Sequence, residues 1–168
     1  MKTLSLEQLT HIETIKSVVY KLARALDRVD EDMLKSCFWD TATDDHGLFK
    51  GSASDFIDWV IPLLNSMKRT QHIIANVIIE FDGDTATVES YFLAYHELLS
   101  DEQSTDMFAA GRYVDTFVLK EEQWKIQHRH AVYDWNRNDK SSHNWYEEPF
   151  DKLLERGERF PDDFIYKK

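Results

Sequence analysis

The chain has 168 residues, of which 42% are hydrophobic and 13% aromatic, and its 31 acidic and 20 basic residues give a formal net charge of −11. This length and composition are typical of one globular domain and exclude a disordered or repetitive chain. The acidic charge disfavours nucleic acid as a partner, because proteins bind phosphate mainly through Lys and Arg, and the scattered basic residues offer no patch to a membrane surface.

The first predicted element is an amphipathic helix that follows Ser5, which can form a capping box with Gln8. Its apolar residues recur every three or four positions and form one stripe: Leu9, Ile12, Ile15, Val18, Val19, Leu22 and Leu26. Charged residues interrupt the segment 1–20, so we expect neither a signal peptide nor a membrane span there.

Two shorter helices and a strand are predicted next. Asp30 is a candidate N-cap for a short helix, residues 41–50 are expected to form a strand and turn, and Asp55 to Met67 is a helical stretch. Cys37 is the lone cysteine, so an internal disulfide is excluded and a reducing compartment is indicated. We therefore expect a cytoplasmic protein.

The second half of the chain has the period-two pattern of strands. Four strands are predicted, over residues 71–81, 85–99, 106–120 and 123–136. Helices followed by an antiparallel meander predict an α+β fold with the helices on one face of the sheet. A last helix is expected from Asn144 to Gly157, and the absence of a repeat or linker predicts a single domain over 1–168.

Three residues of this pattern could carry chemistry. Asp27 closes the apolar stripe of the first helix, and His72 and His96 lie in otherwise apolar strands. From composition alone, a surface position for Asp27 and a hydrogen-bonded core position for each histidine are the competing interpretations.

The turn between the first two strands decides whether the histidines share a face. A two-residue turn at Asp82-Gly83 places His72 opposite Leu93, whereas a three-residue loop over 82–84 places it opposite Ala94, with His96 next on the same face. The second register also pairs apolar residues: Ile74 with Phe92, and Ile78 with Val88. We therefore favour the second register.

A metal site is the alternative use of the remaining histidines. The His128-x-His130 pair puts two imidazoles on one strand face, and Asp44-Asp45-His46 could add ligands. Because the spacing shows no clear third ligand, we expect no metal. A nucleophile elbow and a Gly-rich phosphate loop are also absent from the sequence.

Five short runs occur in the order and spacing of SnoaL-like proteins: Ala25-Leu26-Asp27, Asp45-His46-Gly47, Thr70-Gln71-His72, Gly111-Arg112-Tyr113 and Trp124-Lys125-Ile126. Over nearly its whole length the chain resembles this family of the nuclear-transport-factor-two-like superfamily, and within it scytalone dehydratase most of all. The resemblance implies a cone-shaped fold, an α+β barrel in which N-terminal helices pack on a strongly curved antiparallel sheet. It also implies a C-terminal helix near the pocket mouth.

The resemblance also implies catalytic residues. The two catalytic histidines of scytalone dehydratase fall on His72 and His96. Similarity to hexachlorocyclohexane dehydrochlorinase and bile-acid dehydratase places their aspartate–histidine pair on Asp27 and His72, and an arginine of the dehydrochlorinase falls on Arg129.

The implied pocket wall departs from scytalone dehydratase at three positions. Tyr113 stands where that family has asparagine, Leu26 where it has a tyrosine, and His46 near its second pocket tyrosine. Since those groups bind the substrate's oxygens, the substrate cannot be taken from the resemblance. The expected substrate-binding residues are His46, Tyr113, Trp39, Trp59, Phe92 and Trp135.

The function that follows is cofactor-independent elimination of water or HX from a small, apolar, cyclic or aromatic oxygenated compound. Neutral His72 would remove a proton and Asp27 would stabilise its imidazolium, while His96 or Tyr113 would hold an oxygen where charge develops. Two alternatives stay open: a proton-shuttling isomerase or cyclase of the ketosteroid isomerase or polyketide cyclase type, and a non-catalytic binding domain.

Two further expectations concern surfaces. The first strand has a second apolar face that a homodimer or homotrimer would cover: Ile73, Ala75, Val77, Ile79 and Phe81. Residues 1–139 are expected to form the core, and the apolar segment 140–168 to cover the pocket mouth and exclude water.

Overall fold

The fold consists of a sheet with helices on one side, in a computed structural model that describes residues 3–99 and 104–167. The helices and strands are α1 (Leu6–Arg28), α2 (Glu31–Ser36), β1 (Phe38–Asp45), β2 (Lys50–Ser52), α3 (Ala53–Ser66), β3 (Arg69–Asp82), β4 (Thr85–Leu98), β5 (Thr105–Lys120), β6 (Gln123–Lys140), α4 (Phe150–Leu153) and the 3₁₀-helix η1 (Phe164–Tyr166). The strand order is β2-β1-β6-β5-β4-β3, antiparallel throughout except for the β1–β6 pair.

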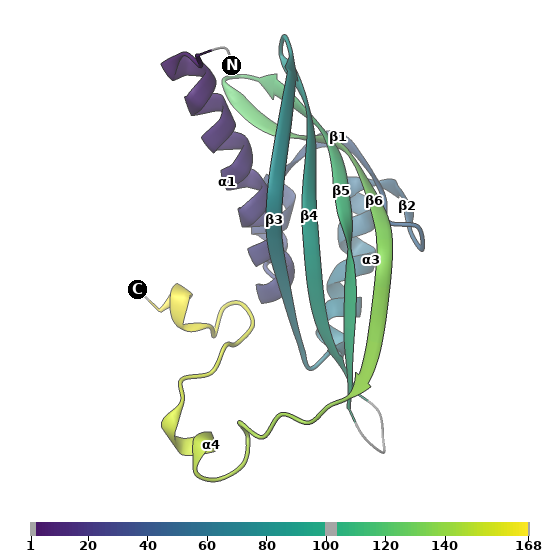
Figure 1. The fold of residues 1–168 in the computed structure, drawn as a ribbon, viewed down its shortest axis with the longest axis vertical. Coiled ribbons are helices and arrows are strands. Elements are labelled where there is room, and N and C mark those ends of the chain that lie inside the picture. Colours follow the sequence, from purple (N-terminus) through teal and green to yellow (C-terminus); the bar gives the residue numbers. More distant parts are fainter. Residues whose placement is uncertain (1–2, 100–103, 168) are drawn as a thin grey trace.

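The predicted α+β class is confirmed. The sheet is strongly curved, with α1 packed against β3 and α3 against β1 (Figure 1). It is not a closed barrel, because β2 and β3 remain its two edges. The core lies between sheet and helices, and its fully buried members include Ile15, Leu22, Leu34, Phe56, Phe117 and Ile126.

The helix starts follow the sequence. Ser5 and Gln8 form the predicted capping box, with Gln8 N donating to Ser5 Oγ over 3.1 Å and Ser5 N donating to Gln8 Oε1 over 2.9 Å. The Asp30 carboxylate accepts from Met33 N at 3.0 Å, as an N-cap does. Helix α1 ends where Val29 adopts the left-handed conformation, with a φ of 53°. Within residues 3–99 and 104–167, no helix is long and apolar enough to cross a membrane.

Near the histidines, the β3–β4 register is the one that the sequence analysis favoured, but a three-residue loop is not its cause. His72 lies opposite Ala94 and Ile74 opposite Phe92, yet the strands run together as far as Asp82 opposite Thr85, so the turn has two residues. A bulge at Asn76, with a φ of 36°, shifts the register by one residue.

Because of this bulge, the predicted faces of β3 are wrong for the residues beyond Asn76. Beyond Asn76, Val77 and Ile79 pack against the helix-side core, whereas Ile78 is 53% exposed on the outer face. The predicted pair of Ile78 with Val88 is therefore wrong, because Ile79 takes that place. One extra residue inverts the alternation of every residue beyond it.

The C-terminal helix predicted for Asn144 to Gly157 is reduced to the four residues of α4. Leu153 and Leu154 are 71% and 41% exposed, so this stretch lacks the apolar packing that stabilises a short helix. Residues 141–167 form turns and irregular chain around α4 and η1, and the last part of the segment lies beside the C-terminal end of α1 (Figure 1).

Candidate active site

An apolar cavity of about 480 Å³ opens between α3 and the inner face of the sheet. Phe56, Trp59, Val60 and Leu63 of α3 form one side, and Phe92 lies on β4. The polar groups at its surface are side-chain tips: His46, His72, His96, Tyr113 and Tyr133. Small-molecule sites combine a similar volume with an apolar lining and a few polar groups.

Asp27 and His72 are in direct contact. Nδ1 of His72 lies 2.7 Å from Asp27 Oδ1, and the backbone N of His72 donates to Asp27 Oδ2 over 2.9 Å. Their side chains are 12% and 7% exposed. Because an ionised carboxylate only accepts hydrogen bonds, Nδ1 must carry the proton, which leaves Nε2 of a neutral His72 with a free lone pair.

The end of α1 positions Asp27. Arg159 donates to the Asp27 carbonyl oxygen, to Thr70 Oγ1 over 2.8 Å and to Leu64 O over 3.2 Å. One guanidinium thus joins the last turn of α1, the last turn of α3 and the start of β3. Burial lowers the pKa of Arg159, and the Asp27 carboxylate partly offsets that effect.

His96 lies beside His72 on the cavity surface. The two rings meet edge to face, with centroids 5.3 Å apart, and Nδ1 of His96 is buried without a hydrogen-bond partner among the described residues. Burial, together with the neighbouring His72, lowers the pKa of His96 to about 4. A neutral His96 can therefore orient a water molecule or a substrate oxygen at neutral pH.

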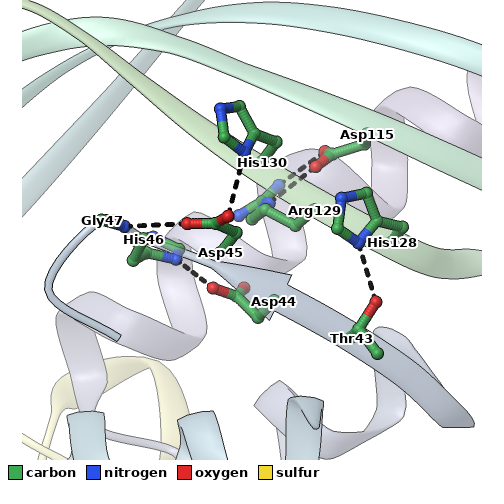
Figure 2. A network of polar contacts seen from close by, with 9 residues as sticks. All are labelled: Thr43, Asp44, Asp45, His46, Gly47, Asp115, His128, Arg129 and His130. Atoms are coloured by element: carbon green, nitrogen blue, oxygen red, sulfur yellow. Dashed lines mark hydrogen bonds and ion pairs between the residues drawn. The ribbon is translucent and has the colours of Figure 1, made fainter. Parts of the chain in front are cut away.

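A second set of polar contacts begins at His46 on the cavity surface and continues behind it to side chains of β1, β5 and β6 (Figure 2). Nδ1 of His46 contacts Asp44 Oδ1, and Asp44 is 1% exposed. Arg129 donates to both carboxylate oxygens of Asp115, over 2.8 and 2.7 Å. Burial would lower the pKa of Arg129, but the charge and hydrogen bonds of Asp115 outweigh burial and raise it.

Arg129 supports one wall of the cavity. Its guanidinium lies 4.0 Å from the centre of the Tyr113 ring, which stacks on Phe92 at 4.4 Å on its other face. Burial raises the pKa of Tyr113, so the phenol stays protonated. The catalytic role that the resemblance implied for Arg129 is corrected to a supporting one, because Arg129 lies behind Tyr113 and does not line the cavity.

Comparison with protein families decides to which family the chain belongs. The model of the SnoaL-like domain matches residues 7–130. The chain belongs to the SnoaL-like family. No curated protein sequence matches it.

Solved structures share the fold of this SnoaL-like chain. A scytalone dehydratase candidate from Novosphingobium aromaticivorans DSM 12444 is 22% identical, with a TM-score of 0.69 over 77% of this chain and 87% of the other. A type 2 hexachlorocyclohexane dehydrochlorinase, LinA, is 20% identical, with a TM-score of 0.73 over 82% and 95%. The LinA-type3 dehydrochlorinase from Novosphingobium barchaimii LL02 is 19% identical, with a TM-score of 0.71 over 79% and 92%.

Two tryptophans expected in the SnoaL-like pocket lie elsewhere. Trp39 donates from Nε1 to Val118 O over 3.0 Å, and Trp135 is 54% exposed. A bulge at Asp134 turns Trp135 outward, since Ala110 pairs with Trp135 while Gly111 pairs with Tyr133. Trp59 and Phe92 do line the cavity, as expected.

Sequence reasoning missed several functional candidates. Tyr133 reaches the cavity from β6, where it pairs with Gly111 two residues along from the Tyr113–Ala131 pair, and Met107 lines it from β5. Asp44 was weighed only as a metal ligand, although its place two residues before His46 on a strand is typical of side chains on one face. Arg159 had no local signal, because its partners are far away in the chain.

The two histidines considered for metal binding contact side chains of β1 instead. His128 Nδ1 lies 2.7 Å from Thr43 Oγ1, and His130 pairs with Asp45 at 3.5 Å (Figure 2). Across the described residues, no group of three or more His, Cys, Asp or Glu side chains is arranged to hold a metal ion.

The C-terminal segment does not line the apolar cavity, contrary to the expected cover. Instead, residues 145–159 help to line a second, more polar cavity of about 630 Å³, which also borders Asp27 and His72. The segment is held there by Tyr166, whose hydroxyl donates to Asp30 Oδ2 over 2.9 Å, and by the ion pair of Arg28 with Asp163 at 3.2 Å. These contacts make it a brace for the end of α1.

Proposed function

We propose that this SnoaL-like protein is a cofactor-independent lyase that eliminates water or HX from a small, apolar, cyclic or aromatic oxygenated compound. One observation carries the proposal. The Asp27 carboxylate accepts a hydrogen bond from Nδ1–H of His72, which leaves Nε2 as a proton acceptor beside an apolar cavity. The family and the fold of the dehydrochlorinases and the scytalone dehydratase candidate support the same class of chemistry.

His72 acts as the general base in this proposal. It removes a proton from the carbon next to a carbonyl or similar acidifying group, and Asp27 stabilises the imidazolium that forms. The enolate oxygen needs a hydrogen-bond donor, and His96 and Tyr113 are the neutral groups at the cavity surface that can supply one. The apolar lining strengthens these interactions because it excludes water.

A pair of synthetic ketones tests the proposal. A β-hydroxytetralone and the matching β-chlorotetralone lose water or HCl to give a naphthol, which absorbance detects. We expect the protein to accelerate at least one elimination, and His72→Gln to abolish the acceleration. His130→Gln is the matched control, because that histidine is half exposed and outside the cavity.

Other outcomes would replace the proposal. Exchange of the acidic carbon-bound hydrogen with deuterium, without loss of either leaving group, would identify a proton-shuttling isomerase or cyclase. Binding of the ketones in a thermal-shift assay, with neither exchange nor elimination, would identify a binding domain.

We also propose that the chain self-associates, as a homodimer or homotrimer, through the outer face of the sheet. Ile73, Leu93, Ala110 and Trp135 form one row across four strands, and Ile73 and Trp135 are 52% and 54% exposed. A partner subunit would cover this apolar row. Light scattering should therefore give more than the monomer mass, and Ile73→Lys should reduce it. A monomer at micromolar concentration contradicts the proposal.

The buried free thiol of Cys37 supports a location in a reducing compartment, and we propose the cytoplasm. Burial raises the pKa of this thiol to about 11, so it has little tendency to form the reactive thiolate.

A further inference from the structure

His46 repeats the arrangement of His72 on a different wall of the same cavity. Asp44 contacts its Nδ1, so the carboxylate again accepts from Nδ1–H. The His46 ring stacks on Phe56, with centroids 4.5 Å apart and an interplanar angle of 16°, and its side chain is 11% exposed. Within the described part of the chain, Nε2 of His46 has no hydrogen-bond partner, so it is available to a bound molecule.

The charges behind the two histidines differ. Behind His46, Asp115 forms an ion pair with Arg129, and the Asp44 carboxylate interacts electrostatically with the same guanidinium. All three side chains are at most 1% exposed. This group carries one negative charge in excess while His46 is neutral. A buried uncompensated charge is costly, and a proton on His46 removes it.

Behind His72 the charges already balance. The Asp27 carboxylate interacts with the Arg159 guanidinium, which lies at the same helix end. A proton on His72 would therefore add an uncompensated positive charge next to His96. One cavity thus holds two carboxylate–histidine pairs whose surroundings favour opposite protonation states, which is how one site provides both an acid and a base.

We propose that His46 is the general acid that protonates the departing hydroxyl group, with Asp44 as its positioning residue. The inference rests on the proposed function and assigns the second half of that reaction. The C–H bond breaks and its proton goes to Nε2 of His72, while the electron pair forms the new C=C bond. The C–O bond breaks, and the leaving oxygen takes the bonding pair and the Nε2 proton of His46 to become water. Solvent then removes the proton from His72 and returns one to His46.

The leaving group provides a sharp kinetic test. Hydroxide is a poor leaving group and needs the proton of His46, whereas chloride leaves without one. We expect His46→Gln to lower kcat/KM for the β-hydroxytetralone by about a hundredfold or more, and for the β-chlorotetralone by no more than about threefold. Asp44→Asn should act in the same direction, and His72→Gln should abolish both reactions. Equal losses on the two ketones, or no loss on the hydroxy compound, would overturn the role of His46.

The pH dependence adds a second kinetic readout. Elimination of water should decline at high pH as His46 loses its proton, and elimination of HCl should not. The ionisable groups that surround His46 are Asp44 and Asp45 of β1, Tyr113 and Asp115 of β5, and Arg129, His130 and Tyr133 of β6. Burial raises the pKa of both tyrosines, so neither phenol accounts for a decline near neutral pH.

The protonation states can be measured without any substrate. In ¹⁵N-histidine-labelled protein at neutral pH, with His46→Gln and His72→Gln to assign the signals, we expect both ring nitrogens of His46 to be protonated. His72 should be neutral with its proton on Nδ1. A neutral His46 overturns the inference even if elimination is observed. If both states are found but neither ketone reacts, the elimination proposed above fails instead, and the protonated His46 stands.

Discussion

The two polar walls of the cavity bury charge in different ways. On the α1–β3 wall, Asp27 has a 12% exposed side chain, borders a second polar cavity and meets His72 through two hydrogen bonds. On the wall formed by β1, β5 and β6, Asp115 and Arg129 are almost completely buried and joined by a two-pronged ion pair. A carboxylate near a polar cavity suits a group that must gain and lose protons. The buried Asp115–Arg129 pair suits the part of the second wall that must keep its shape, whereas the Asp44–His46 pair beside it is proposed to exchange a proton.

The largest expected effect is on the first wall. Asp27→Asn keeps the shape of the side chain but removes the charge that stabilises the His72 imidazolium and selects its tautomer. We expect a loss of about a thousandfold or more in kcat/KM for elimination, by analogy with the aspartate of a Ser-His-Asp triad. Unfolding by urea should change little by comparison, and Asp32→Asn on the exposed face of α2 is the matched control. A fully active Asp27→Asn variant would show that this wall is not built for proton transfer.

Substitutions in the second wall should mainly change the free energy of unfolding. Asp115→Asn leaves the Arg129 guanidinium buried without its carboxylate, which should lower the free energy of unfolding by about 3–5 kcal/mol. Chemical denaturation measures this loss directly. The double variant Asp115→Leu with Arg129→Met removes both charges and should recover much of it. A loss below about 1 kcal/mol for Asp115→Asn would mean that the wall is not held by this ion pair.

The smallest expected effect concerns His96 and depends on pH. The pKa of His96 falls from 6.5 to about 4 on folding, so between these values the unfolded chain binds a proton that the folded protein does not. The contribution of His96 to stability is therefore present above about pH 6.5 and is lost as the pH falls to about 4, by at most about 3 kcal/mol. Denaturation curves of the wild type and His96→Gln should diverge over this range, with the variant less sensitive to acid. Parallel curves would contradict the buried, neutral state of His96.

Local signals in the sequence predicted one wall better than the other. Asp27 and His72 each lie in a short motif on a regular element, so the pattern and the family resemblance identified both, and the structure brings them together. The roles of Asp44 and Arg129 depend on contacts between strands that are far apart in the chain. The resemblance implied a catalytic role for Arg129, and only the packing of β5 against β6 shows that Tyr113 lies between it and the cavity.

Irregular positions explain the other errors. The bulges at Asn76 and Asp134 each add one residue to a strand, and each inverts which side chains face the helices. The alternation of apolar residues does not reveal such an extra residue, so the outer position of Trp135 could not be predicted from it. The His72 register was right because the Asn76 bulge compensates for a turn that is one residue shorter than the favoured loop.

The sequence by itself determined the first two helices and their starts, the α+β class, the family and the Asp27–His72 pair, because capping, periodicity and short motifs are local properties. Only the tertiary structure decided which aromatic residues reach the cavity, that the C-terminal segment braces α1, and that His46 and Asp44 form a second pair. Those outcomes depend on bulges, on long-range hydrogen bonds such as those of Arg159, and on the balance of buried charge. None of these features can be read from residues that are adjacent in the chain. Each forms only when distant segments pack together and exclude water.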